Sequence, residues 1–217
     1  MSRGMKVVGD YAANGYAHIE NIVPAEIAAA LLERVSIEMG NRPIDLRAVT
    51  EYPTLLDRPA LDVSGHVYYP MNFFLWGLTP IISEIVGKEL LPTYDFLRIY
   101  RQGDKCNVHS DRYSCEHSLS LTLGYSDDEP WDLQVERERT EPTPQIDRNF
   151  RGSFASIKMK SGDALLYQGI HHRHGRTDPN PNRWSAHIFL HWVDRDGPYR
   201  EYAFEGQMPG KTEFQFV

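Results

Sequence analysis

The second half of the chain, from Pro92 onward, alternates short apolar runs with turn-forming residues. Such runs, bounded by glycine, proline, asparagine or aspartate, predict β-strands, and several in succession are typical of a sandwich or barrel. The predicted strands cover residues 94–101, 119–125, 131–136, 153–159, 164–167, 184–193 and 199–204. We therefore expect a mainly β core over residues 93–204.

The N-terminal part, residues 1–92, predicts helices and loops after two short strands within residues 6–22. Pro24 suits a first helical turn, apolar residues then recur at helical spacing, and Gly40 ends the pattern. We expect this helix to cover one side of the sheet.

Residues 41–69 contain three prolines and little periodicity, which predicts a long loop that acts as a lid or simply covers the surface. A second helix is expected over residues 79–86. Thr79 would be its N-cap and Pro80 its first helical residue.

Size and charge restrict the class of protein. A chain of 217 residues is long enough for one domain with a substantial core, so we expect a single domain over residues 1–217. The net charge of -7 argues against a nucleic-acid partner. The longest apolar run, residues 73–78, is too short to span a bilayer, and no secretory signal is visible. We expect a cytoplasmic protein without a membrane partner.

His109 and Asp111 are separated by one residue. Alternate residues of a strand project from the same face, so this imidazole and this carboxylate can bind one metal ion from one side. A third ligand can come from the cluster of His171, His172 and His174. Nitrogen and oxygen ligands without thiolate suit iron(II), although zinc is also compatible.

The His-x-Asp pair, the distal histidines and the sequence Arg183-Trp184-Ser185 resemble the iron(II)- and 2-oxoglutarate-dependent dioxygenases. Tyr100 and Gly103, ahead of the pair, are similar to the prolyl-4-hydroxylase-like branch. The resemblance covers roughly residues 94–194. It implies an α+β fold, mainly β with flanking helices, around a double-stranded β-helix, the jelly-roll core also found in cupins.

The distal ligand has to be chosen among three histidines. His174 lies nine residues before Arg183 and His172 lies eleven before it, and both spacings agree with the family. The two share strand parity, so alternation does not separate them. His174 is followed by a polar loop, as is usual in the family, so we favour His174, with His172 as the alternative and His171 last.

The resemblance also implies how 2-oxoglutarate would bind. Arg183 and Ser185 would hold its far carboxylate, and Tyr100 would add a phenolic hydrogen bond. Tyr125 is either a further such donor or a core aromatic residue. Alternation over residues 183–191 gives one apolar face, expected to pack on helices, and one polar face, expected to point into the barrel mouth.

Two further residues are candidates for substrate contact. Arg98 shares the strand parity of Tyr100, and His187 shares that of Arg183. For both, a structural role is the alternative: an ion pair for Arg98 and a satisfied core histidine for His187.

The activity implied by the resemblance is oxidation by O2 and 2-oxoglutarate at an iron(II) held by His109, Asp111 and His174. The enzyme would hydroxylate an unactivated carbon of a small metabolite, an amino acid or a peptide residue, with release of succinate and CO2. Desaturation or ring closure uses the same kind of centre and stays open. The rival hypothesis is a non-catalytic cupin-like module that binds metal or ligand.

Overall fold

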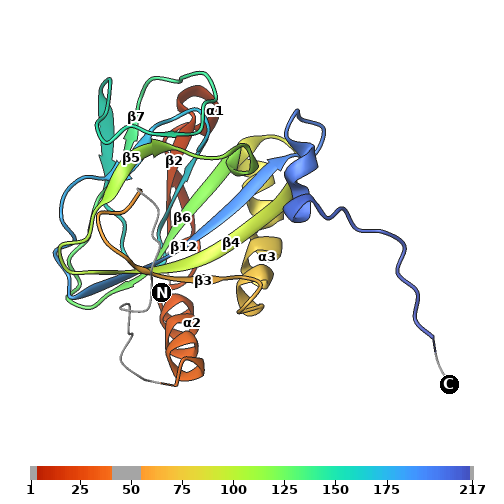
Figure 1. The fold of residues 1–217 in the computed structure, drawn as a ribbon, viewed down its shortest axis with the longest axis horizontal. Helices are drawn as coiled ribbons and strands as arrows, with labels where there is room; N and C mark the ends of the chain where they lie inside the picture. The colour runs from red at the N-terminus through yellow and green to blue at the C-terminus, as the bar shows by residue number, and fades with distance from the viewer. Residues whose placement is uncertain (1–3, 41–54, 216–217) are drawn as a thin grey trace.

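The computed structural model describes residues 4–40 and 55–215, which form two antiparallel sheets with helices packed on the larger one (Figure 1). The larger sheet has, in spatial order, β1 (Lys6–Val8), β2 (Tyr16–Glu20), β10 (Ala164–Tyr167), β6 (His117–Tyr125), β12 (Trp184–Asp194), β4 (Leu90–Arg101) and β3 (Leu61–Ser64). The smaller sheet has β8 (Gln145–Ile146), β5 (Cys106–Ser110), β11 (His174–Arg176), β7 (Leu133–Glu136) and β9 (Phe154–Ile157).

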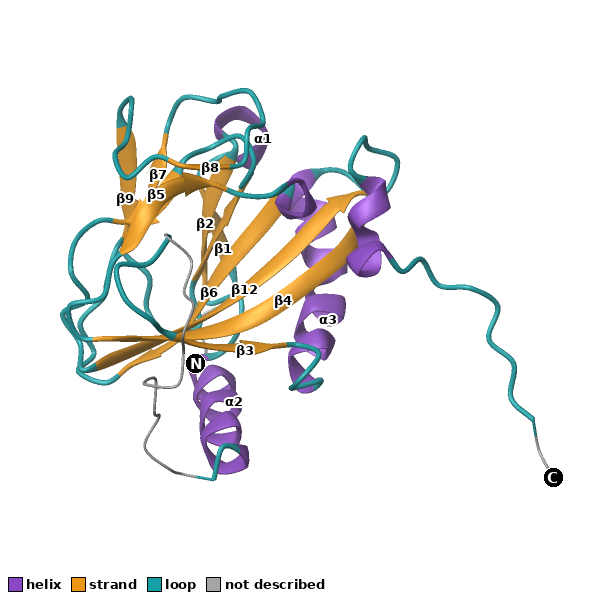
Figure 2. Cartoon of the chain, in the orientation of Figure 1, coloured by secondary structure: helices purple, strands orange, loops and turns teal. Residues whose placement is uncertain are grey.

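Two long helices, α2 (Ala25–Glu38) and α3 (Pro70–Val86), cover one face of the larger sheet (Figure 2). The short elements are the helix α1 (Tyr11–Asn14) and the 3-10 helices η1 (Tyr113–Cys115) and η2 (Arg200–Gly206). This is the predicted jelly-roll core with flanking helices. Within residues 4–40 and 55–215, every helix is too short or too polar to cross a bilayer.

The main hydrophobic core lies between the helices and the larger sheet. Strand β12 contributes Ala186, Ile188, Leu190 and Trp192, all without solvent exposure. Burying an aliphatic side chain of this size stabilises the fold by about 1.5–3 kcal/mol. The predicted apolar face of this strand is therefore confirmed, except that Trp184, at its first position, is 36% exposed.

Helix α3 begins much earlier than predicted, at Pro70, so the expected helix start at Thr79 is wrong. Its buried residues Met71, Leu75, Leu78 and Ile82 recur at helical spacing. Their burial outweighs the cost of about 3 kcal/mol for the internal Pro80. The Thr79 hydroxyl donates to the carbonyl of Leu75 at 2.8 Å and accepts from the Trp192 indole at 2.9 Å. Thr79 therefore links the helix to the sheet.

Three other differences concern local structure. Residues 199–204 were expected as a strand, but residues 200–204 belong to η2, which is kinked where Phe204 and Glu205 adopt left-handed φ values of 51° and 57°. The short strands β5, β8 and β11 were not among the predicted ones. Part of the predicted loop over residues 41–69 forms β3, and residues 41–54 lie outside the described residues.

Candidate active site

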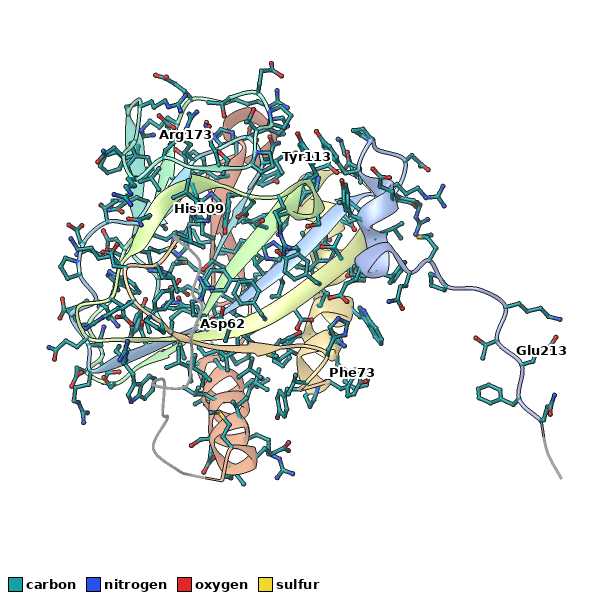
Figure 3. All side chains as sticks on the ribbon, viewed as in Figure 1. Asp62, Phe73, His109, Tyr113, Arg173 and Glu213 are labelled. Atoms are coloured by element: carbon teal, nitrogen blue, oxygen red, sulfur yellow. The ribbon has the colours of Figure 1, made fainter. Side chains whose placement is uncertain are left out.

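His109 and His174 occupy neighbouring strands of the smaller sheet. His109 lies near the end of β5, on the side that faces the larger sheet, and is paired in register with His174 of β11 (Figure 3). Asp111 follows β5 directly, and its Oδ1 lies 3.4 Å from His109 Nε2 and 3.5 Å from His174 Nε2. One ligand atom from each residue lies within 4.8 Å of the others. We call these three residues the metal triad.

Backbone carbonyls fix the orientation of both imidazoles. The Nδ1 of His109 lies 2.8 Å from the carbonyl oxygen of Asn107, and the Nδ1 of His174 lies 2.9 Å from that of His172. A carbonyl only accepts, so each Nδ1 carries a proton, and each ring is held with its Nε2 on the side of Asp111. Carbonyl partners of this kind orient histidine ligands in many metal sites.

The ionisation of the triad suits a divalent cation. Burial lowers the pKa of His109, and the neighbouring His174 lowers it further, so this imidazole is neutral near pH 7. Burial alone would raise the pKa of Asp111, but His174 and His109 hold it well below its usual range. Two imidazole nitrogens and one carboxylate oxygen converge on one point, which is a donor set that suits iron(II).

Two glycines allow the triad to assemble. A Cβ on Gly169 would lie 2.2 Å from Asp111 Oδ2, while the Gly169 carbonyl accepts from the Asp111 amide at 2.9 Å. A Cβ on Gly175 would lie 2.9 Å from the carbonyl oxygen of Cys106 on the adjacent strand. Each position therefore needs glycine because backbone or ligand atoms pass too close for a side chain.

The structure brings only one of the three clustered histidines to His109 and Asp111. The Nδ1 of His172 bonds the carbonyl of Glu136 at 2.9 Å, and that of His171 bonds the carbonyl of Thr140 at 2.8 Å. Strand β11 begins at His174, so the alternation that gave His172 the same parity does not extend back to it.

A cavity of about 650 Å³ opens from the metal triad between the two sheets. Tyr100, 1% exposed, and Arg176, also 1% exposed, line it along with the triad. A volume of this size is typical of small-molecule sites.

Arg176 is the functional candidate that the sequence reasoning missed. Its guanidinium carbon lies 4.8 Å above the ring of Trp131, and it donates a hydrogen bond to the Trp131 carbonyl. Its Nη2 lies 3.4 Å from His187 Nδ1. Among the described residues no carboxylate pairs with this buried cation. The available signal was its position two residues after His174, which gives both the same strand parity.

Arg183, expected to bind 2-oxoglutarate, lies away from the cavity. Its side chain is 72% exposed, and its Nε lies 3.1 Å from Asp127 Oδ1. Residue 183 precedes the first residue of β12, so the alternation of that strand does not extend to Arg183. The placement of Arg183 at the surface contradicts its expected contact with the cosubstrate.

Two other side chains that were expected to contact the cosubstrate form hydrogen bonds within the fold instead. The Ser185 hydroxyl is buried and accepts from Asn180 Nδ2 at 3.1 Å. The Tyr125 hydroxyl donates to the carbonyl of Met159 at 3.1 Å, which agrees with its alternative reading as a core aromatic residue. Neither side chain lines the cavity, whereas Tyr100 does.

The two candidates for substrate contact have structural partners. Arg98 lines the cavity, but its Nε and Nη2 donate to the two Asp62 oxygens at 2.6 and 2.7 Å, so its charge is compensated. His187 is fully buried beside Arg176, and its Nε2 has no hydrogen-bond partner among the described residues. Burial lowers the pKa of His187 well below its usual range, as does the charge of Arg176.

No protein-family model and no curated protein matches this sequence. Solved structures do match the fold. SnoK, a non-heme alpha ketoglutarate dependent carbocyclase from nogalamycin biosynthesis, is 12% identical over 86% of this chain and 82% of its own, with a TM-score of 0.63. EctD from S. alaskensis, with bound Fe, is 16% identical over 92% of this chain and 83% of its own, with a TM-score of 0.60.

A prolyl-4-hydroxylase from Pseudomonas putida is 14% identical over 87% of this chain and 96% of its own, with a TM-score of 0.58. At such low identities the similarity shows a shared fold. The expected fold class, a double-stranded β-helix core with flanking helices, is therefore confirmed.

Proposed function

We propose that this chain is an iron(II)- and 2-oxoglutarate-dependent oxygenase that hydroxylates a carbon of a small molecule or peptide residue. The metal triad would hold iron(II), and Arg176 would hold the far carboxylate of 2-oxoglutarate. The proposal is supported by solved structures of the same fold whose names include a ketoglutarate-dependent enzyme, a prolyl-4-hydroxylase and a protein with bound Fe.

The observation that carries the proposal is the buried, uncompensated charge of Arg176 in the cavity of the metal triad. A buried cation without a counter-ion costs several kcal/mol. An anionic ligand offsets this cost, and arginine can bind a carboxylate through two parallel hydrogen bonds. A site for a carboxylate beside a site for a metal is what a 2-oxo acid requires.

Distances along β11 agree with this ligand. His174 and Arg176 are two residues apart, about 6.6 Å along an extended strand, and their side chains project from the same face. A five-carbon diacid can therefore reach from the metal triad to Arg176. Tyr100 lines the same part of the cavity and offers a phenolic hydroxyl.

When bound, iron(II) with 2-oxoglutarate and O2 supplies the oxidation of a substrate C–H bond, coupled to release of succinate and CO2. The chain itself holds and orients the ligands. Ser118 Oγ donates to Asp111 Oδ2 at 3.1 Å, so Asp111 keeps its other oxygen, Oδ1, directed at the two histidines. The half-buried rings along the cavity restrict access of water to the metal triad.

The test compares two arginines. The full chain is first loaded with iron(II) in the absence of oxygen, and binding of 2-oxoglutarate is measured by calorimetry. Air is then admitted, and the succinate formed is measured. We expect binding, and slow succinate formation without substrate. Arg176→Gln should weaken binding by about 30-fold or more, since a buried charge-assisted pair is lost, whereas Arg183→Gln should leave it unchanged.

Two outcomes would contradict the proposal. Loss of binding in Arg183→Gln but not in Arg176→Gln would assign the cosubstrate to another site. Binding of 2-oxoglutarate without any succinate, in parent and variants alike, would favour the non-catalytic binding module.

A further inference from the structure

We propose that the substrate is an aromatic acid, with its ring packed against a row of stacked rings and its anionic group paired with Arg112. This proposal rests on the proposed function, because it names the molecule that shares the cavity with the cosubstrate. It goes beyond the metal triad and Arg176, which specify no substrate.

The row consists of Tyr94 and Phe96 on β4 and Phe189 and His191 on β12, and we call it the aromatic row. Phe96 and Phe189 are register partners, with ring centroids 4.8 Å apart and planes inclined by 19°. The centroids of Tyr94 and His191 are 4.5 Å apart, with planes inclined by 29°. The four rings therefore form one nearly parallel group on the cavity wall.

Three of these rings keep a partly exposed surface inside the cavity. Tyr94, Phe96 and Phe189 are half-buried, although neighbouring positions on the same strands are fully covered. Partly exposed aromatic rings in a concave site favour an apolar or aromatic ligand, which can stack on them or meet them edge to face. The cavity of about 650 Å³ has room for such a ring beyond a five-carbon diacid.

The aromatic row begins beside the metal triad. His191 Nδ1 lies 3.0 Å from Ser118 Oγ, which in turn donates to Asp111 Oδ2. His191 Nε2 is buried and has no hydrogen-bond partner among the described residues. A ring packed on this row would therefore lie close to the iron site, with one unpaired nitrogen available to a polar substituent.

The charge of this part of the cavity is set by Arg112. Arg98 is compensated by Asp62, whereas no carboxylate among the described residues pairs with Arg112. The Arg112 guanidinium lines the cavity, with its carbon 4.9 Å above the ring of Tyr94. An anionic substituent next to the aromatic row would gain an ion pair, and a cationic one would be repelled.

Asp95 does not reverse this preference. Asp95 is also among the residues that line the cavity, but it alternates with Tyr94 and Phe96 along β4, so its carboxylate points toward the opposite face of the sheet. Burial raises the pKa of Asp95 to about 7, which reduces its negative charge near neutral pH. A Cβ on Gly65 would lie 2.3 Å from Asp95 Oδ1, which places this carboxylate beside the turn before α3. Its charge is therefore directed away from the aromatic row.

The test uses three probes of similar size on the full chain loaded with zinc(II) and 2-oxoglutarate, so that no turnover occurs. These are 2-naphthoate, 2-naphthylmethylamine and decalin-2-carboxylate, and binding is measured by calorimetry. We expect 2-naphthoate to bind at least tenfold more tightly than the amine, because only the acid forms the ion pair. It should also bind about threefold more tightly than the saturated acid, which lacks an aromatic ring.

Variants locate the probe. Phe96→Leu and Phe189→Leu should each raise the Kd of 2-naphthoate by about three- to tenfold, and Arg112→Gln should raise it by about tenfold. Phe73→Leu, an exposed phenylalanine on α3 (Figure 3), is the matched control and should have no effect. Binding of 2-oxoglutarate should be unchanged in all four variants.

The proposal fails if the amine binds as tightly as the acid, or if neither Phe96→Leu nor Arg112→Gln weakens 2-naphthoate binding. It also fails if 2-naphthoate binding depends on Arg176 and is lost on addition of 2-oxoglutarate, since the probe would then occupy the cosubstrate site. If 2-oxoglutarate does not bind while the variants still weaken 2-naphthoate binding, the proposed function fails and the aromatic-acid site stands.

Discussion

His174 lies directly opposite His109 on neighbouring antiparallel strands, with ring centroids 4.2 Å apart. The two residues are far apart in sequence, and the pairing of β5 with β11 alone brings them together. Because a carbonyl orients each ring, both Nε2 atoms approach the same Asp111 oxygen. The strand pairing therefore brings the three residues of the metal triad together.

The choice between the clustered histidines can be tested by metal content. His174→Ala should lose iron(II) binding, because one of three donors is removed. His172→Ala should retain iron(II) but unfold about 1–3 kcal/mol more easily, since its buried hydrogen bond to Glu136 is lost. Metal analysis after gel filtration and denaturant unfolding provide the two measurements. Iron loss only in the His172 variant would exclude His174 as the distal ligand.

Gly169→Ala should weaken metal binding about 10- to 100-fold, the range seen when the support of a metal ligand is disturbed. The new methyl group would lie 2.2 Å from Asp111 Oδ2, so the carboxylate must move. Gly77→Ala is the matched control, because nothing lies within 4 Å of its Cβ and alanine in a helix should stabilise the protein by about 0.5–1 kcal/mol. Equal metal affinity in both variants would refute this role of Gly169.

Arg176→Met should abolish the binding of 2-oxoglutarate without lowering the stability of the ligand-free protein. Without ligand, the variant should be at least as stable as the parent to within about 1 kcal/mol, because relief of a buried charge offsets the unpaired Trp131 carbonyl. Added 2-oxoglutarate should raise the Tm of the metal-loaded parent but not that of the variant. A large loss of stability in the ligand-free variant would mean that Arg176 is a structural cation.

The buried His191 predicts a pH dependence of the metal-free protein. Burial lowers the pKa of His191 to about 4, whereas an unfolded histidine titrates near 6.5. The unfolded chain therefore binds one more proton between these values, so this contribution to stability is complete above pH 6.5 and is lost as the pH falls toward 4.

His191→Phe should reduce the slope of the unfolding free energy by about 1.4 kcal/mol per pH unit across that window. Phenylalanine preserves the stacking on Tyr94. Urea unfolding in EDTA between pH 4 and 7 measures the slope, and the exposed His66→Gln variant is the control. Identical slopes for His191→Phe and the parent would show that His191 does not carry this proton.

The sequence predicted the elements with a clear periodic pattern. Helix α2 and strand β10 match closely, and the two faces of β12 are divided as expected, because periodicity reports which side of an element is buried. Strand β11 has only three residues, too few for a pattern. The predicted start of α3, at Thr79, was too late, because the sequence does not distinguish a proline inside a helix from a proline in its first turn.

The candidate site was also predicted only in part, because local periodicity identifies residues within one strand but not the ends of short strands. The spacing of His109 and Asp111 is local, so alternation on a strand could identify it, and the structure places His174, the favoured distal histidine, 3.5 Å from Asp111 Oδ1. Which arginine faces the cavity depends on where the strands β11 and β12 begin and end. Arg183 lies just before β12, where strand alternation does not hold, whereas Arg176 lies inside β11, on the same face as His174.

The gradient of burial along the cavity has a kinetic consequence. Arg176 is 1% exposed, at the inner end, whereas the half-buried Tyr94 and Phe96 and the exposed Arg112 lie nearer the solvent. The two molecules proposed above would occupy one cavity, the diacid at its most buried residues and the aromatic acid at its more exposed ones. Loading should therefore be sequential, the diacid first and the aromatic acid second, and an excess of the aromatic acid should slow turnover by trapping the protein without its cosubstrate.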